Sequence, residues 1–180
     1  MTKLLSITTI IILLGLAFGP LSTRSGEKQM GTTITHTRDF EKMKELVGVW
    51  EGTADTDKGM EMLKVAYELT SAGNAILEKF AVGQPHEMIT VYYDSGGKLT
   101  MTHYCSLGNR PHMELMKSGK SAMEFVLSKK NHGLSAMDET HMHALHISFD
   151  GKDNITETWT LYDKGEKKSD ITIKLARTKS

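Results

Sequence analysis

The spacing of apolar residues changes sharply near Gly48. Between positions 40 and 47 they recur every three or four residues, which predicts one short amphipathic helix from Arg38 to Leu46. Thr37 is suited to cap the first turn of this helix, because its hydroxyl can accept a hydrogen bond from a free backbone N–H. Beyond Gly48, apolar and polar residues alternate with a period of two, which is typical of β-strands.

Ten segments with this alternation follow, and turns rich in Asp, Asn and Gly separate them. Their expected bounds are Val47–Ala54, Met60–Thr70, Ala75–Val82, Met88–Tyr93, Lys98–Leu107, His112–Lys117, Ser121–Leu127, His141–Phe149, Asn154–Tyr162 and Lys168–Arg177. Short strands in close succession predict an antiparallel meander, and a large sheet tends to curl until its edges meet. We therefore expect an all-β, antiparallel, closed or nearly closed barrel with one short N-terminal helix. A two-sheet sandwich is the alternative.

An apolar run from Leu4 to Phe18 follows a single lysine at the start of the chain. It is too short for a comfortable membrane span but has the length of a signal-peptide core, and the small residues Thr23 and Ser25 predict cleavage after position 25. We expect residues 1–25 to be a signal peptide, 26–37 a flexible N-terminal segment and 38–180 the barrel domain. The protein would then be exported, to the periplasm or the cell exterior, without a stable membrane span. An uncleaved anchor is the alternative.

The overall composition excludes several classes of function. The 22 Lys and Arg residues balance 22 Asp and Glu residues, so no basic stripe for nucleic acid is expected. Cys105 is the single cysteine, which excludes an intramolecular disulfide and a multi-cysteine zinc site. The composition does not predict an oligomeric state.

The predicted helix leads directly into Gly48-Val-Trp50 at the start of the first strand. This motif resembles the Gly-x-Trp start of calycin barrels, which include lipocalins, fatty-acid-binding proteins and nitrobindin-like domains. The resemblance implies that Trp50 closes one end of the barrel. No helical lid is expected between the first two strands, which points away from the fatty-acid-binding proteins. No histidine follows His146, so the C-terminal haem-ligating histidine of nitrobindins has no match.

Further motifs extend the resemblance along most of the chain. They are Pro85-His86-Glu87-Met88, Thr102-His103-Tyr104-Cys105, Gly108-Asn109-Arg110-Pro111 and His141-Met142-His143. As a set they resemble a family of exported bacterial proteins of unknown function with a lipocalin-like barrel. The resemblance implies this fold for residues 38–180, and it implies no activity.

The alternation places ionisable residues on the apolar, inward faces of four strands. These residues are Glu78, His103, Cys105, His141, His143 and Glu157. Burying such groups without partners costs roughly 1–3 kcal/mol each. We therefore expect a cavity with functional side chains, in which Trp50 and Trp159, together with Tyr67 and Phe80, supply apolar wall. The predicted ligand-binding residues are Trp50, Glu78, His103, Cys105, His143, Glu157 and Trp159.

Three interpretations of this interior remain open. The polar groups can satisfy one another, they can bind the polar end of a small organic ligand, or they can hold a divalent metal. For a metal, His141 and His143 would both ligate one ion, and His103 or a carboxylate would complete the set. We favour a barrel that binds a small, partly apolar molecule, without an assigned catalytic residue. The alternatives are a metal-assisted enzyme with Glu78 or Glu157 as base, a metal- or haem-binding protein that uses the inward histidines, and an envelope protein that acts through its surface.

Overall fold

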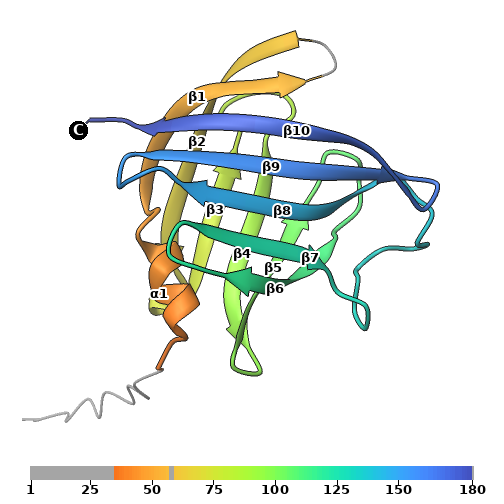
Figure 1. The fold of residues 1–180 in the computed structure, drawn as a ribbon, viewed down its shortest axis with the longest axis horizontal. Coiled ribbons are helices and arrows are strands. Elements are labelled where there is room, and N and C mark those ends of the chain that lie inside the picture. The colour runs from red at the N-terminus through yellow and green to blue at the C-terminus, as the bar shows by residue number, and fades with distance from the viewer. Residues whose placement is uncertain (1–34, 57–58, 180) are drawn as a thin grey trace, which may run out of the picture. The chain divides into compact units, whose positions relative to one another are not determined.

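The computed structural model describes residues 35–56 and 59–179. Within them a short helix precedes ten antiparallel strands that form a closed barrel (Figure 1). The elements are α1 Arg38–Lys44, β1 Gly48–Thr56, β2 Gly59–Thr70, β3 Ala75–Phe80, β4 Met88–Ser95, β5 Lys98–Tyr104, β6 His112–Ser118, β7 Ala122–Leu127, β8 His141–Phe149, β9 Asn154–Asp163 and β10 Glu166–Arg177. Each strand pairs with its neighbours in the sequence, and β1 pairs with β10 to close the sheet. The predicted barrel is confirmed, and the sandwich alternative is wrong.

The element bounds differ from the prediction by a few residues. The helix ends at Lys44 rather than at Leu46. The strand expected to run to Val82 ends at Phe80, because Ala81 adopts a left-handed backbone conformation with φ of 54°. These shifts leave the inward rows of β3 and β5 unchanged.

Helix α1 is fixed at one end of the barrel by its cap. The Thr37 hydroxyl accepts a hydrogen bond from the Phe40 N–H at 3.1 Å and donates one to the Asp94 carboxylate of β4 at 2.6 Å. Phe40 and Met43 are fully buried on the face of the helix that turns toward the barrel. The helix therefore covers this end of the barrel, which we call the closed end.

Trp50 fills the barrel beneath the helix. It is fully buried, its indole N–H donates a hydrogen bond to the Leu46 carbonyl at 2.8 Å, and the Arg177 guanidinium lies 4.2 Å from the centre of its ring. Arg177 also donates a hydrogen bond to the Val47 carbonyl at 2.8 Å. The last strand is thereby fixed to the segment between helix and first strand, at the seam where the sheet closes.

The apolar core extends from the closed end to the middle of the barrel. Its largest fully buried side chains include Phe40, Met43, Trp50, Ile76, Leu99, Met101, Met113, Met123 and Phe125. Each such side chain contributes roughly 1.5–3 kcal/mol through burial. This half of the barrel is filled by side chains, so any cavity has to lie toward the other end.

The N-terminal predictions are not tested by the structure. The expected signal peptide, 1–25, and most of the expected flexible segment, 26–37, lie outside the described residues. Across residues 35–56 and 59–179, no helix has the length and apolarity needed to cross a membrane.

Gly52 is a position where closure of the barrel requires glycine. A Cβ atom built on Gly52 would lie 1.8 Å from the carbonyl oxygen of Lys174 on β10. We expect Gly52→Ala to lower the free energy of unfolding by about 1–3 kcal/mol or more, because backbone atoms cannot move aside cheaply. Urea denaturation measures this change. The control is Gly119→Ala, whose Cβ would find its nearest neighbour at 4.0 Å, and we expect it to change stability by no more than about 0.5 kcal/mol. Equal effects of the two substitutions would contradict this account of the β1–β10 seam.

Candidate functional site

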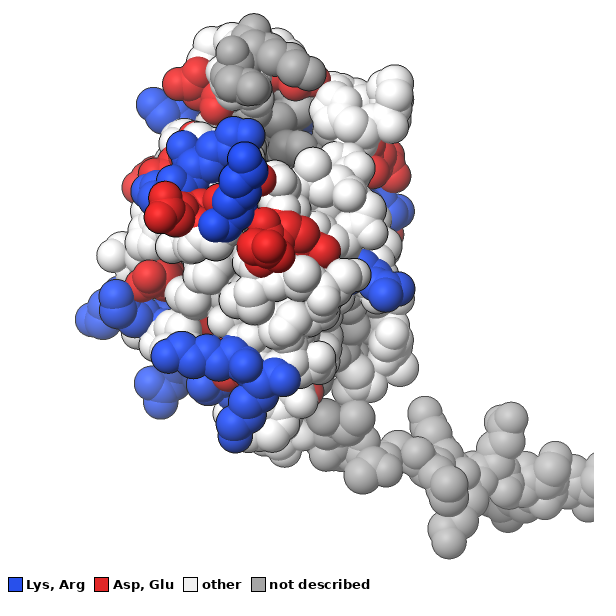
Figure 2. Space-filling view, turned by 90° about the vertical axis from the view of Figure 1, so that its right-hand side faces the viewer, with Lys and Arg blue, Asp and Glu red and all other residues white. Residues whose placement is uncertain are grey.

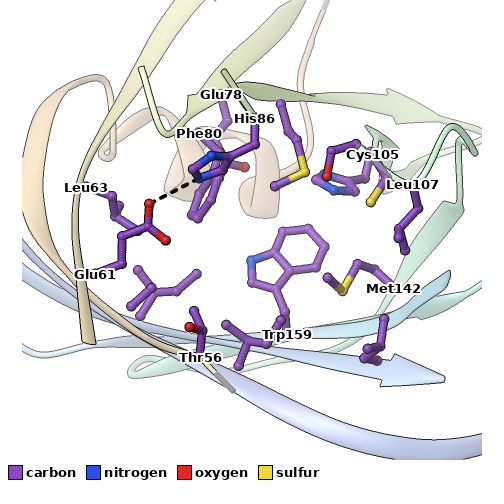
Figure 3. A pocket seen from close by; sticks show the side chains of 17 residues that line it. Thr56, Glu61, Leu63, Glu78, Phe80, His86, Cys105, Leu107, Met142 and Trp159 are labelled. Atoms are coloured by element: carbon purple, nitrogen blue, oxygen red, sulfur yellow. Dashed lines mark ion pairs between the residues drawn. The ribbon is translucent and has the colours of Figure 1, made fainter. Parts of the chain in front are cut away.

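A cavity of about 410 Å³ opens at the end of the barrel opposite to α1 (Figure 3). Its wall is mostly apolar and comes from both sides of the barrel. The apolar and sulfur-containing lining residues are Ala54, Leu63, Phe80, Met88, Cys105, Leu107, Met142, Leu161, Ile171 and Ile173. Glu78, His103 and Trp159 line its inner part, which we call the floor. At the opening, which we call the mouth, His86 Nε2 lies 3.4 Å from a carboxylate oxygen of Glu61.

The floor is built by strands that lie on opposite sides of the barrel. Glu78 is in β3 and His103 in β5, and each alternates with apolar residues that also face inward. Glu157 and Trp159 occupy equivalent inward positions of β9. The strand alternation therefore predicts the direction of these four side chains correctly. Their role in ligand binding stays a prediction.

Glu157 lies behind the floor and is fully buried. One of its carboxylate oxygens accepts a short hydrogen bond from the Tyr67 hydroxyl, and the other accepts one from the Trp159 indole N–H at 3.2 Å. Both oxygens thus face donors. This arrangement fixes the indole ring of Trp159 at the bottom of the cavity.

Glu78 and His103 are linked through neighbouring residues of β4. The Tyr92 hydroxyl donates a hydrogen bond to Glu78 Oε2 at 2.7 Å, and Thr90 Oγ1 lies 3.0 Å from His103 Nδ1. Thr90 and Tyr92 both point inward from this strand. The His103 ring packs against Trp159 with 4.7 Å between ring centres. The floor is therefore one connected network.

Two polar atoms of this network have no hydrogen-bond partner within the described residues. They are Glu78 Oε1 and His103 Nε2, and both are shielded from water. A buried polar atom without a partner costs roughly 1–3 kcal/mol. Both atoms belong to residues that line the cavity, so a bound molecule could supply the missing partners.

The two buried carboxyl groups compete for one negative charge. Burial raises the pKa of Glu78 well above its ordinary value of 4.5, and the neighbouring Glu157 raises it further. Burial also raises the pKa of Glu157, while hydrogen bonds from Tyr67 and Trp159 act in the opposite direction. Because Glu157 accepts two donors and Glu78 Oε1 accepts none, Glu157 is the better site for a negative charge and Glu78 the better site for a proton at neutral pH.

His103 is uncharged under the same conditions. Burial lowers its pKa from 6.5 to about 4. Thr90 Oγ1 faces His103 Nδ1 at 3.0 Å, and a neutral imidazole has one donor and one acceptor nitrogen. Nε2, the other ring nitrogen, has no hydrogen-bond partner within the described residues.

Cys105 lines the cavity nearer the mouth and is 9% exposed. Burial raises the pKa of its thiol, so the group remains protonated at neutral pH. It therefore contributes a small apolar surface rather than a thiolate. Its predicted place in the cavity agrees with the structure.

The structure does not place Trp50 in the cavity. This residue was predicted to form part of the ligand-binding wall, but it lies at the closed end and hydrogen-bonds to Leu46. The position of Trp50 agrees instead with the role that the Gly-x-Trp resemblance implied. The prediction was wrong because alternation gives the face of a strand on which a residue lies, but not its height along the barrel axis.

The prediction that His141 and His143 share the cavity with His103 is also wrong. The pairing of β8 with β9 shifts between Met142 and Ala144, and this bulge reverses the alternation. Met142 faces the cavity opposite Leu161, whereas His141 lies opposite Tyr162. His143 stacks on the Tyr162 ring with 3.8 Å between centres, outside the cavity lining.

The predicted metal site is therefore not assembled. His141 Nε2 and His143 Nδ1 lie 3.1 Å apart, so these nitrogens contact each other. Among the described residues, no group of three or more His, Cys, Asp or Glu side chains could hold a metal ion. His103 belongs to a separate site on the cavity floor.

Some residues of the site were not identified from the sequence. Thr90 and Tyr92 alternate with Ile89 and Val91, so the spacing could have identified them as inward polar groups. His86 reaches the mouth from the β3–β4 loop, and no periodicity applies to a loop. Met142 was not among the predicted cavity residues, because the bulge in β8 has no sequence signal.

The buried carboxyl pair predicts an unusual dependence of stability on pH. A raised pKa of Glu78 in the folded state means that stability is greatest below its ordinary value of 4.5 and is lost as pH rises toward the folded value. Glu78→Gln keeps the size of the side chain and removes this titration. Between pH 4.5 and the folded pKa of Glu78, we expect the free energy of unfolding of the variant, relative to that of the unmodified protein, to increase by up to about 1.4 kcal/mol per pH unit.

Urea denaturation at intervals between about pH 5 and 8 measures this difference. The control is Glu51→Gln, which removes a carboxyl from the exposed side of β1. A difference between Glu78→Gln and the unmodified protein that does not change with pH would show that Glu78 is ionised when folded.

Comparisons with known proteins show the fold alone. No family model matches the sequence, and no curated protein matches it. A protein of unknown function from the DUF3598 family of Nostoc punctiforme PCC 73102 is similar in structure, with a TM-score of 0.52 and 12% sequence identity. The match covers 76% of this chain and 49% of that protein, so the chain spans about half of its length.

Rv2717c from M. tuberculosis is also similar, with a TM-score of 0.53 and 14% identity over 81% of this chain and 100% of that one. At these identities the likeness extends to the barrel and not to the residues of the cavity. The structural neighbours are consistent with an uncharacterised family of barrels. The expected relation to lipocalins and to an exported bacterial family stays a prediction.

Proposed function

We propose that this barrel binds a small, partly apolar molecule in the cavity at its open end. The observation that carries the proposal is the pair of buried polar atoms without partners, Glu78 Oε1 and His103 Nε2, on the floor of a largely apolar cavity. A molecule that hydrogen-bonds to both atoms would recover the free energy that their burial costs. Trp159, between them and the apolar wall, offers an aromatic surface for the rest of the ligand.

The size and the lining of the cavity support this function. A volume of about 410 Å³ lies within the range of roughly 300–1,000 Å³ that is typical of small-molecule sites. Such sites combine an apolar wall with a few fixed polar groups, and here the hydrogen bonds to Thr90, Tyr92 and Tyr67 fix those groups in advance. A preformed site of this kind loses little conformational entropy when it binds a ligand.

We further propose that binding takes place outside the cytoplasm. The apolar run from Leu4 to Phe18 and the small residues before position 26 support export. The single cysteine is compatible with an oxidising compartment, since no second thiol in this sequence is available for an intramolecular disulfide.

A variant that fills the cavity tests the proposed function. We expect the neutral dye N-phenyl-1-naphthylamine to bind the purified protein and to fluoresce more strongly in the apolar cavity. Met142→Trp places a larger side chain on the cavity wall, and we expect it to weaken binding by at least about tenfold. Fluorescence titration measures the dissociation constant, and circular dichroism checks that strand content is kept.

The matched control is Met116→Trp, the same substitution at a residue of β6 that is 59% exposed. It should leave the affinity unchanged. Dye binding that responds equally to both variants, or no dye binding at all, would count against a binding cavity. Native mass spectrometry of the unmodified protein, followed by denaturing extraction, would in addition reveal an organic molecule that co-purifies with it.

A further inference from the structure

We infer that the cavity selects uncharged ligands that carry a hydroxyl group and excludes carboxylates. The inference rests on the proposed function and names the chemical class of the ligand. It follows from the way donors, acceptors and charges are distributed on and around the floor.

The floor presents one hydrogen-bond donor and one acceptor. Glu78 Oε2 already accepts from Tyr92, so the proton of the neutral carboxyl is free to lie on Oε1, which has no partner. We place the His103 proton on Nδ1, where Thr90 Oγ1 at 3.0 Å can accept it, so Nε2 is the acceptor. A hydroxyl group both accepts and donates, so one hydroxyl, or two neighbouring ones, can satisfy both atoms.

A carboxylate cannot satisfy the same pair. It has no proton to donate, so His103 Nε2 would face another acceptor. His103 cannot become a cation easily, because burial lowers its pKa to about 4. The thiol of Cys105 is likewise neutral, because burial raises its pKa.

No positive charge compensates an anion at this place. Among the described residues that line the cavity, none is a lysine or an arginine. On the face seen in Figure 2, Lys and Arg side chains lie on the outer surface, intermixed with Asp and Glu. At the mouth, His86 is already paired with Glu61.

The carboxyl group behind the floor disfavours an anion as well. Glu157 lies directly behind the floor, where it holds the Trp159 indole by a hydrogen bond of 3.2 Å. In a buried environment the repulsion between two anions is screened far less than in water. A fatty acid or another carboxylate would therefore bind with its charge at the mouth, or would not bind.

Three ligands with the same aromatic body test this inference. They are 2-naphthol, which is uncharged and both donates and accepts; 2-methoxynaphthalene, which only accepts; and 2-naphthoate, which is an anion. We expect 2-naphthol to bind at least about tenfold more tightly than 2-naphthoate at pH 7, and about three- to tenfold more tightly than 2-methoxynaphthalene. Isothermal titration calorimetry measures all three, and displacement of N-phenyl-1-naphthylamine confirms that they share the cavity.

A substitution that adds a cation provides a second readout. Met142→Arg places a guanidinium at the cavity wall, and we expect it to reduce or reverse the preference for 2-naphthol over 2-naphthoate. Met116→Arg, on exposed β6, is the matched control and should keep the preference of the unmodified protein. If Met142→Arg does not fold, the three-ligand comparison on the unmodified protein still tests whether the cavity prefers 2-naphthol to 2-naphthoate.

The outcomes separate this inference from the proposed function. Binding of 2-naphthoate as tight as that of 2-naphthol would overturn the exclusion of carboxylates and leave the binding function intact. Equal binding of 2-naphthol and 2-methoxynaphthalene would overturn recognition of the hydroxyl. Binding of the dye without any of the three ligands would overturn the ligand class as a whole. If neither the dye nor the ligands bind, the proposed function fails, and this inference fails with it.

Discussion

Two carboxyl groups buried in the middle of an apolar barrel are the constraint on which the rest of the interior depends. Glu78 and Glu157 are both fully buried, and neither faces a lysine or an arginine within the described part of the barrel interior. Two adjacent buried anions would be prohibitively costly, so one group keeps its proton. Tyr67, Tyr92 and Trp159 provide hydrogen bonds that stabilise the remaining charge and hold the neutral carboxyl in place.

The hydrogen-bond network around Glu78 and Glu157 separates a packed half of the barrel from a half that contains the cavity. On one side, α1, Trp50 and the methionine-rich core pack without reaching the open end. On the other side, the inward side chains leave an open cavity above Glu78, His103 and Trp159. Closure of the sheet at the β1–β10 seam stabilises the packed half. The polar floor thus sits on a rigid base, which is the condition for a site whose donors and acceptors are fixed before a ligand arrives.

The sequence predicts the barrel and most of the floor, because both depend on strict alternation. Glu78, His103 and Glu157 follow apolar residues at steps of two, and no irregularity interrupts β3, β5 or the relevant part of β9. His141 and His143 were misplaced because one extra residue in β8 reverses the inner and outer faces, and a bulge is set by the pairing partner rather than by local composition. Trp50 was misplaced along the barrel axis, which no local pattern records. The position of His86 at the mouth could not be predicted either, because His86 lies in a loop and strand periodicity does not apply to loops.

A similar fold in other proteins cannot replace this reasoning about the floor. The barrel is shared at 12% and 14% identity, so the neighbours show the path of the chain and not the chemistry of its inward side chains. In a closed barrel, a ligand contacts the inward-facing side chains of the strands. The identity of these side chains can change without changing the fold, as long as the apolar alternation persists. A neutral carboxyl and a neutral imidazole on the same floor are therefore properties of this chain. They bring a donor and an acceptor together without net positive charge, and that combination favours a hydroxyl group over an anion.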